Sequence, residues 1–192
     1  MVSRPQADLT ELIAELARRL TERELPYMLI GGQAVLLHGR PRVTEDIDVT
    51  LGVGPTELPA VLDLCGALGL EPLPERVDEF VRDTYVLPAR HPHTAMRVDF
   101  IFSTTPYEQQ AIARAERIEL GGCQVAFATA EDLMIHKLFA ARPRDLEDAA
   151  GVVARKGHAL DWEYLAHWAE QFAQVPGREE FPEQVARLKL KA

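Results

Sequence analysis

The spacing of hydrophobic positions changes along the first fifty residues from a helical period to short strand-like runs. Leucine and isoleucine recur every three or four residues over 7–24, which predicts a helix. Two short apolar runs follow at 27–30 and 47–51, and both have the length of a strand. The apolar run 34–37 between them predicts one or two helical turns. This stretch predicts a strand, a glycine-rich turn into a short helix, and a second strand.

The rest of the chain continues with alternating helix and strand signals. Helices are predicted over 56–68, 75–82, 106–115, 129–141, 143–155 and 162–173, with Thr56 and Thr129 as N-caps. Strands are predicted over 84–87, 96–102, 117–120 and 124–127, and the last two are joined as a hairpin by Gly121-Gly122. Residues 69–74 are predicted as a loop, and a polar tail is expected after Pro176-Gly177. We therefore expect an α/β fold with a mixed sheet covered by helices, a core over 1–128, and a helical C-terminal segment over 129–192 packed on it.

Composition limits the classes of protein to which the chain can belong. With 47% hydrophobic and 27% charged residues among 192, the chain can bury a core. No apolar run reaches the roughly 20 residues that span a bilayer, and the N-terminus lacks the apolar region of a signal peptide. The two cysteines, Cys65 and Cys123, form no metal-ligand spacing and are expected as buried free thiols. We expect a cytoplasmic protein without a membrane segment.

The net charge of −9 argues against a protein that coats nucleic acid through a general positive field. A local basic patch remains compatible with that charge. Six cations fall in or beside the segments that carry candidate chemistry: Arg40, Arg42, Arg97, Lys137, Arg142 and Arg144.

The first candidate binding residues are Gly31-Gly32, for an anion, and the acidic pair Asp46 and Asp48, for a cation. Glycine lets the backbone approach a ligand closely, and the N-terminus of a short helix presents free N–H groups to an anion. Residues i and i+2 of a strand face the same side, so both carboxylates are expected to project together. They are either strand-start caps and surface ion pairs, or ligands of a hard cation such as Mg²⁺. Glu45 is expected to face the other way, into solvent.

The pattern of Gly31-Gly32, then residues 33–45, then Asp46-Ile47-Asp48-Val49 resembles the signature of the DNA polymerase β-like nucleotidyltransferase superfamily. Gly-Gly-x-Ala, with His-Gly-Arg-x-Arg-x-Thr-x-Asp-Ile-Asp after it, is similar to the minimal bacterial nucleotidyltransferases. These include the abortive-infection toxins of toxin–antitoxin pairs, and lincosamide-type antibiotic nucleotidyltransferases share a similar block. The resemblance implies the nucleotidyltransferase fold. Many members have Ser after the first Gly, whereas this chain has Gly32, so backbone N–H groups must hold the phosphates there.

Asp99 lies in the apolar strand 96–102, where an unpaired carboxylate is costly. One interpretation is an ion pair with Arg97 on the same strand face. The resemblance implies another, in which Asp99 is the third carboxylate of a site for two Mg²⁺ ions, with Mn²⁺ as an alternative metal. In that role Asp99 also helps to deprotonate the attacking hydroxyl.

The segment from Glu131 to Asp148 resembles a helix pair of the Abi-type enzymes, in which a lysine and a downstream aspartate are functional. This resemblance implies that Lys137 binds nucleotide phosphates and that Asp145 orients Lys137 or Arg142. The alternatives are a lysine packed along an apolar stripe and an aspartate placed for the helix dipole. Arg40 and Arg42, in the loop before the acidic pair, are either contacts for the nucleotide triphosphate or the acceptor, or exposed loop arginines that bind neither.

The resemblance implies Mg²⁺-dependent transfer of a nucleoside monophosphate from an NTP to an acceptor hydroxyl. The expected acceptor is RNA, such as a tRNA end, or a protein, and the chain would then be the toxin partner of a cognate antitoxin. A small-molecule antibiotic is the alternative acceptor. A third hypothesis is a non-catalytic member that acts as a binding protein, although a binding module has no need for a costly carboxylate cluster.

Overall fold

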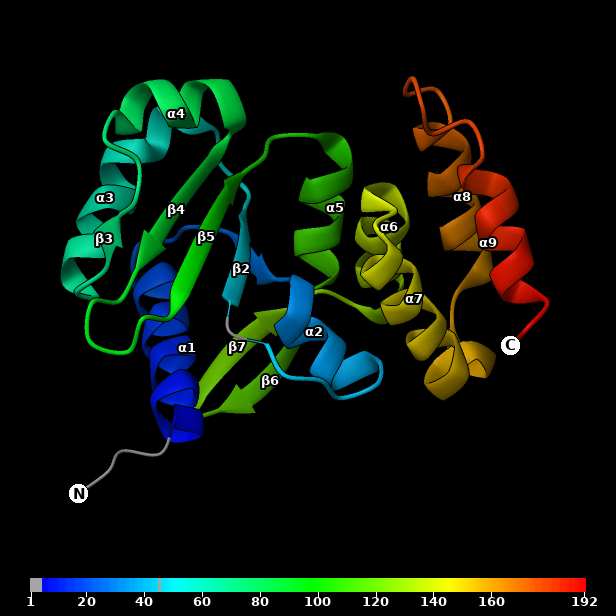
Figure 1. The fold of residues 1–192 in the computed structure, drawn as a ribbon, viewed down its shortest axis with the longest axis horizontal. Coiled ribbons are helices and arrows are strands. Elements are labelled where there is room, and N and C mark those ends of the chain that lie inside the picture. Colours follow the sequence, from blue (N-terminus) through cyan, green and yellow to red (C-terminus); the bar gives the residue numbers. More distant parts are fainter. Residues whose placement is uncertain (1–4, 45) are drawn as a thin grey trace. The chain divides into compact units, whose positions relative to one another are not determined.

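The computed structural model describes residues 5–44 and 46–192, which form two compact units (Figure 1). The first contains the residues up to Ile30 together with Thr44–Phe127, and the second contains Gly31–Val43 and Ala128–Ala192. The predicted division into 1–128 and 129–192 stays a prediction about domains. These compact units differ from it in grouping residues 31–43 with the C-terminal helices.

The first unit is built on a mixed sheet, seven-stranded in the described residues. Its strands are β1 (Tyr27–Leu29), β2 (Asp46–Leu51), β3 (Glu71–Pro72), β4 (Val86–Arg90), β5 (Arg97–Phe102), β6 (Glu116–Leu120) and β7 (Cys123–Phe127). The spatial order is β3-β4-β5-β2-β1-β7-β6. The pairs β2/β5 and β1/β7 are parallel and the other neighbours are antiparallel. The expected mixed α/β architecture is confirmed.

Four α-helices accompany the sheet among the described residues of this unit: α1 (Pro5–Glu22), α3 (Leu58–Ala67), α4 (Val77–Thr84) and α5 (Pro106–Arg114). Helix α1 packs against the β6–β7 hairpin. The predicted hairpin turn is confirmed, with φ of +57° at Gly121 and +74° at Gly122. A Cβ at Gly121 would lie 2.9 Å from the Cβ of Ala14, so glycine is required there for both backbone conformation and space.

The second unit is helical: α2 (Gly31–His38), α6 (Ala130–Ala140), α7 (Pro143–Lys156), the 3₁₀ turn η2 (Gly157–Ala159), α8 (Trp162–Phe172) and α9 (Phe181–Lys189). The predicted cap at Thr129 is confirmed, because its hydroxyl accepts a hydrogen bond from the backbone N–H of Asp132 at 3.1 Å. The same hydroxyl donates to the Asp132 carboxylate at 2.7 Å. Both side chains are buried, and these hydrogen bonds supply partners for polar groups at the start of α6 that have no access to water.

Two predictions about local structure are wrong. Thr56 does not cap a helix, because a 3₁₀ turn, η1 (Pro55–Glu57), comes first and α3 begins only at Leu58. Residues after Gly177 are not simply a polar tail, because α9 buries Phe181 and Val185 on one face. These two residues have the i, i+4 spacing of a helix face, and Phe181 stacks on Phe172 with ring centroids 6.0 Å apart.

Two smaller corrections concern the loop 69–74 and the cysteines. Glu71–Pro72 pairs with β4 as the short edge strand β3. Cys65 is buried as expected, and burial raises the pKa of its thiol to about 12, but Cys123 is only half-buried. Both thiols are free. Within the described part of the chain, no helix is long and apolar enough to cross a membrane.

Candidate functional site

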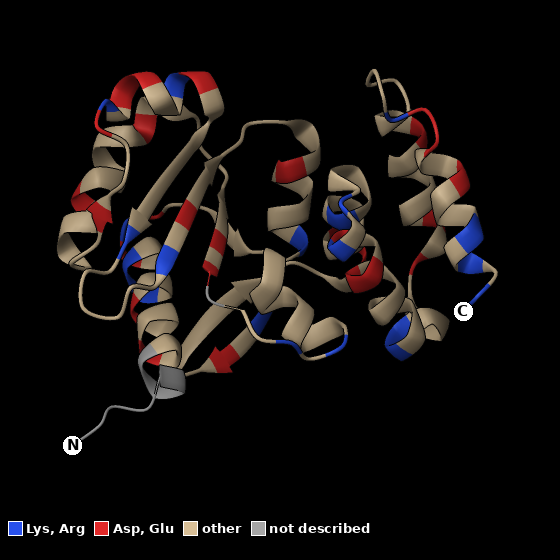
Figure 2. Ribbon diagram, in the orientation of Figure 1, with Lys and Arg blue, Asp and Glu red and all other residues tan. Residues whose placement is uncertain are grey.

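Strands β2 and β5 bring three of the predicted carboxylates together. Their parallel register places Asp48 opposite Asp99 and Asp46 opposite Arg97. Ile47 and the other alternate residues of both strands are buried, whereas these four charged residues lie on the opposite, more accessible face. Figure 2 shows the acidic (red) and basic (blue) segments on the ribbons of β2 and β5. Because adjacent strands lie about 4.8 Å apart, one face of the strand pair carries three carboxylates and one guanidinium.

Arg97 is the counter-charge of this group. Its Nε donates to Oδ1 of Asp99 at 2.7 Å, with the Asp99 side chain 17% exposed. The hydrogen bond to Asp99 raises the pKa of Arg97 above its ordinary value, and the charges of Asp46 and Asp48 add to the effect. The ion pair considered from the sequence is therefore present, and it involves the same carboxylate that the family resemblance implies as a metal ligand.

The donor set suits a hard divalent cation. Three carboxylates on one strand face are the oxygen ligands that Mg²⁺ prefers. As the side chains are placed, however, the described residues contain no group of three or more His, Cys, Asp or Glu side chains already arranged to hold a metal ion. The ligands are thus chemically suitable, while one of them is engaged by Arg97. Glu45, expected in solvent, lies outside the described residues.

Helix α2 begins directly at Gly31, three residues earlier than the predicted turn at Ala34. Gly31 has φ of +61°, a conformation that glycine adopts without strain, and this permits an abrupt change from strand to helix. Gly32 is buried. The first N–H groups of a helix have no partner within it, so the glycine pair supplies backbone donors rather than a side-chain hydroxyl.

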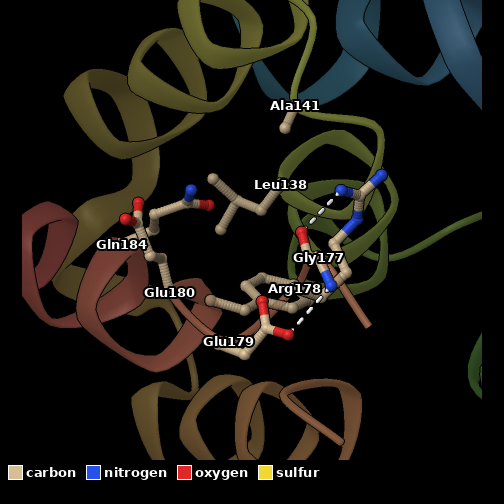
Figure 3. A pocket seen from close by; sticks show the side chains of 8 residues that line it. Leu138, Ala141, Gly177, Arg178, Glu179, Glu180 and Gln184 are labelled. Atoms are coloured by element: carbon tan, nitrogen blue, oxygen red, sulfur yellow. Dashed lines mark hydrogen bonds between the residues drawn. The ribbon is translucent and has the colours of Figure 1, made fainter. Parts of the chain in front are cut away.

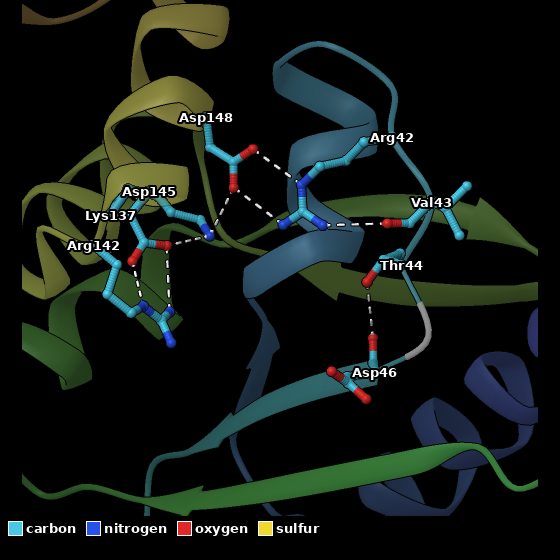
Figure 4. Close-up of polar contacts among 8 residues, drawn as sticks. All are labelled: Arg42, Val43, Thr44, Asp46, Lys137, Arg142, Asp145 and Asp148. Carbon is cyan, nitrogen blue, oxygen red and sulfur yellow. Dashed lines mark hydrogen bonds and ion pairs between the residues drawn. The ribbon is translucent and has the colours of Figure 1, made fainter.

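A second charged group lies within the helical unit and is centred on Lys137 (Figure 4). Lys137 Nζ lies 2.8 Å from Asp145 Oδ1 and 2.9 Å from Asp148 Oδ2. Arg142 Nε donates to Asp145 Oδ2 at 2.5 Å, and Arg42 donates to both oxygens of Asp148 at 3.0 and 3.1 Å. We call these five side chains the Lys137 network. Three cations and two carboxylates leave it with one net positive charge.

The three central side chains of the Lys137 network are buried, whereas that of Arg142 is 75% exposed. The side chains of Lys137, Asp145 and Asp148 are 8%, 3% and 6% exposed. Burial by itself raises the pKa of Asp145, but hydrogen bonds from Arg142 and Lys137 outweigh it, and its pKa lies below the ordinary value. For Asp148, the hydrogen bonds from Arg42 and Lys137 outweigh burial in the same way and lower its pKa.

Asp148 is the residue that the sequence analysis did not assign. It joins Arg42 to Lys137, two predicted site residues far apart in the chain. The available signal was its spacing: Asp145 and Asp148 are three positions apart (i, i+3) in a helix and so share a face. Their common partner, Lys137, is on the preceding helix and could not be identified from spacing alone.

The loop that carries Arg42 is anchored within the helical unit. The buried His38 donates from Nε2 to the Ala128 carbonyl at 2.8 Å and accepts from Lys156 Nζ at 2.8 Å. Arg155 Nη1 donates to the Gly39 carbonyl at 3.1 Å. The backbone of Arg40 lies so close to Gly151 that a Cβ there would meet Arg40 N at 3.3 Å. These contacts hold the loop on α7 and hence position Arg42.

Residues 7–189 match a family model described as a nucleotidyltransferase of unknown function (DUF6036). The chain belongs to this nucleotidyltransferase family. No curated protein matches it.

Solved structures similar to this family member have nucleotidyltransferase folds. The antibiotic-resistance factor ANT(2″)-Ia has 16% identity and a TM-score of 0.60, over 91% of this chain and 98% of that one. An antigenic nucleotidyltransferase-like protein from Paracoccidioides brasiliensis has 18% identity and a TM-score of 0.55, over 92% of each chain. A putative nucleotidyltransferase from H. pylori has 14% identity and a TM-score of 0.51, over 99% of this chain and 95% of that one. At such identities the likeness shows the fold, and the Abi-type subgroup stays a prediction.

The DUF6036 chain also has a pocket of about 200 Å³ in its helical unit (Figure 3). It lies beside α6 and the start of α9, and none of the predicted site residues lines it. Arg178, in its wall, donates to the Gly177 carbonyl at 2.9 Å and lies 4.9 Å from the centroid of the Phe139 ring. These contacts give Arg178 a packing role at the junction with α9.

The lowered pKa values in the Lys137 network predict a loss of stability in acid. Asp145 and Asp148 stay ionised in the folded protein at a pH where they are protonated in the unfolded chain, so their contribution is complete above about pH 4 and is lost as the pH falls below it. Urea unfolding at pH 6, 4 and 3 measures this. Trp162 and Trp168 both lie on α8, so their fluorescence reports on the helical unit.

The Asp145→Asn variant is expected to be less stable at pH 6 and to lose less further stability on acidification than the wild type. Asp63, exposed on α3, is the matched control, and Asp63→Asn should keep the wild-type pH dependence. An unchanged pH dependence in Asp145→Asn would contradict the assignment.

Proposed function

We propose that this protein is a Mg²⁺-dependent nucleotidyltransferase that transfers a nucleoside monophosphate from an NTP to an acceptor hydroxyl. The observation that carries the proposal is the register of β2 and β5, which sets Asp48 opposite Asp99 with Asp46 on the same face. In the transfer, the acceptor oxygen forms a bond to the α-phosphorus, the bond to the β-phosphate breaks, and pyrophosphate leaves.

The carboxylates have distinct proposed roles. Asp46, Asp48 and Asp99 would hold Mg²⁺, which supplies charge neutralisation at the transferred phosphoryl group. Asp99 also orients the acceptor hydroxyl and helps to remove its proton. Burial of the alternate residues on β2 and β5 fixes the strand positions, and that rigidity keeps the carboxylates in place when substrates bind.

The helical unit contributes groups that favour phosphate. We assign nucleotide binding to Gly31, Gly32, Arg42, Lys137 and Asp145. The glycines offer backbone N–H donors at the start of α2. The net positive charge of the Lys137 network attracts polyphosphate, and Asp145 and Asp148 hold the side chains of Lys137 and Arg42 in position.

The acceptor is proposed as RNA, such as a tRNA end, or a protein, with the chain as the toxin of a toxin–antitoxin pair. A small molecule is the alternative, because one structural relative, ANT(2″)-Ia, is an antibiotic-resistance factor and has been solved with adenylyl-2″-tobramycin. Incubation of the protein with each α-labelled NTP and Mg²⁺, together with total RNA, cell protein or a drug panel, distinguishes these acceptors. Absence of labelled product in every combination would overturn the transferase proposal and favour a binding protein.

Arg40 and Arg144 are the proposed contacts for an RNA acceptor. Arg42, Arg97 and Arg142 are engaged by aspartates, whereas Arg40 and Arg144 are exposed and form no ion pair in the described ranges 5–44 and 46–192. Because a net charge of −9 gives the chain no general positive field, we assign attraction of RNA phosphates to these two arginines beside the candidate site residues. Arg40→Glu is therefore expected to reduce RNA labelling several-fold at low salt and to weaken its dependence on salt.

Transfer to total tRNA at low and moderate salt measures this effect. Arg82→Glu, which makes the same charge change on the exposed face of α4, is the matched control and should behave as the wild type. A salt-independent rate, or equal effects of the two substitutions, would indicate a small-molecule or protein acceptor.

A further inference from the structure

We infer that Arg97 is a built-in competitor of the metal ion, occupying the counter-charge position of the β2–β5 carboxylates until a divalent cation displaces it. The inference rests on the proposed function for the identity of the cation. It goes beyond that function by assigning a role in metal affinity to a residue that binds neither metal nor substrate.

The position of Arg97 carries the argument. Arg97 is opposite Asp46 in the parallel register and two residues before Asp99, so it shares a face with all three carboxylates. Its Nε is 2.7 Å from Asp99 Oδ1, a short charge-assisted hydrogen bond. Three adjacent carboxylates repel one another unless a cation lies close by, and in the described structure Arg97 is that cation.

Metal binding must therefore replace one cation by another. The guanidinium holds Oδ1, one of the two Asp99 oxygens that Mg²⁺ can use, and the positive charge of Arg97 opposes a second cation at short range. The Arg97 side chain is 43% exposed, so it can swing into solvent without loss of a packed core position. The ion pair lowers the affinity for metal while it stabilises the metal-free carboxylates.

The chain offers a matched control for charge. Arg90 is directly opposite Arg97 in the antiparallel β4/β5 register. It is exposed and forms no ion pair in the part of the chain that the structure describes. Arg90→Gln removes the same charge from the neighbouring strand position without releasing Asp99, so it separates the effect of the contact from the effect of net charge.

The experiment measures binding of Mn²⁺ and Mg²⁺ alone, without nucleotide, by calorimetry and by the shift in melting temperature. Arg97→Gln is expected to bind metal about fivefold more tightly than the wild type, which corresponds to ~1 kcal/mol for a partly exposed ion pair. Its metal-free form should melt at a lower temperature, and saturating Mg²⁺ should raise that temperature more than in the wild type. Arg97→Lys should lie closer to the wild type, and Arg90→Gln should match it.

Each other outcome overturns the inference in a recognisable way. Equal or weaker metal binding by Arg97→Gln, with binding lost in Asp48→Asn, removes the role of Arg97 and leaves the proposed metal site intact. Equal gains in Arg97→Gln and Arg90→Gln show a general charge effect instead of competition. Absence of metal binding in every variant overturns both the inference and the Mg²⁺ part of the proposed function.

Discussion

Replacement of Asp48 by asparagine is expected to reduce nucleotidyl transfer by at least about a thousandfold, since a bound metal supplies several kcal/mol of transition-state stabilisation. Asp48 is half-buried on β2, opposite Asp99, so its loss removes the central carboxylate of the group. Asparagine keeps the shape of the side chain and removes its charge, so the sheet should stay folded. Transfer rates under saturating NTP and Mg²⁺, with circular dichroism of the same samples, measure both effects.

Asp63→Asn is the matched control, because it removes one exposed carboxylate from the same unit without touching the sheet. It should retain the wild-type rate. If Asp48→Asn also keeps a rate near that of the wild type, the carboxylates of β2 do not bind a catalytic metal and the proposed chemistry is wrong.

Lys137→Ala is expected to destabilise the protein by about 3 kcal/mol and to weaken NTP binding. The substitution leaves two buried carboxylates with one arginine each, and removal of one partner from a buried ion-pair group is costly. It also removes a point charge that favours phosphate. Urea unfolding followed by tryptophan fluorescence gives the stability, and calorimetry at a temperature where both proteins are folded gives the nucleotide affinity.

Lys189→Ala, at an exposed position in the last turn of α9, is the matched control and should change neither quantity. Asp99→Asn is expected to show the opposite pattern from Lys137→Ala, with NTP affinity retained and turnover lost. Equal NTP affinity in wild type and Lys137→Ala would limit Lys137 to a structural role within the Lys137 network.

Much of the secondary structure could be predicted from local pattern. Residues 46–49 alternate accessible and buried positions as expected, with Ile47 and Val49 in the core. The Thr129 cap is present because its hydroxyl accepts a hydrogen bond from a backbone N–H in the first turn of α6. The predictions of local structure failed where tertiary packing outweighed the chain-breaking signal of proline and glycine. Charges and Pro176-Gly177 suggested a tail, yet burial of Phe181 and Val185 makes α9 a packed helix.

For the candidate site, the sequence by itself determined the reactive residue types and their local directions. Asp46 and Asp48 face the same side of a strand because residues i and i+2 always do. Asp99 requires a positively charged partner because an unpaired carboxylate in an apolar strand is costly. Only the tertiary structure decided which strands are neighbours. The parallel register of β2 and β5 sets Asp48 opposite Asp99, and this long-range pairing is encoded by packing of the whole sheet.

The same division holds in the helical unit. The helix start at Pro143 and the shared face of Asp145 and Asp148 can be predicted from the sequence, because both depend on residues within one helical turn. The links from Lys137 to both aspartates, and from Asp148 to Arg42 more than a hundred positions away, were decided only by how α2, α6 and α7 pack. Sequence spacing specifies which side chains share a face of one element, whereas contacts between elements depend on the shape of the buried core that joins them.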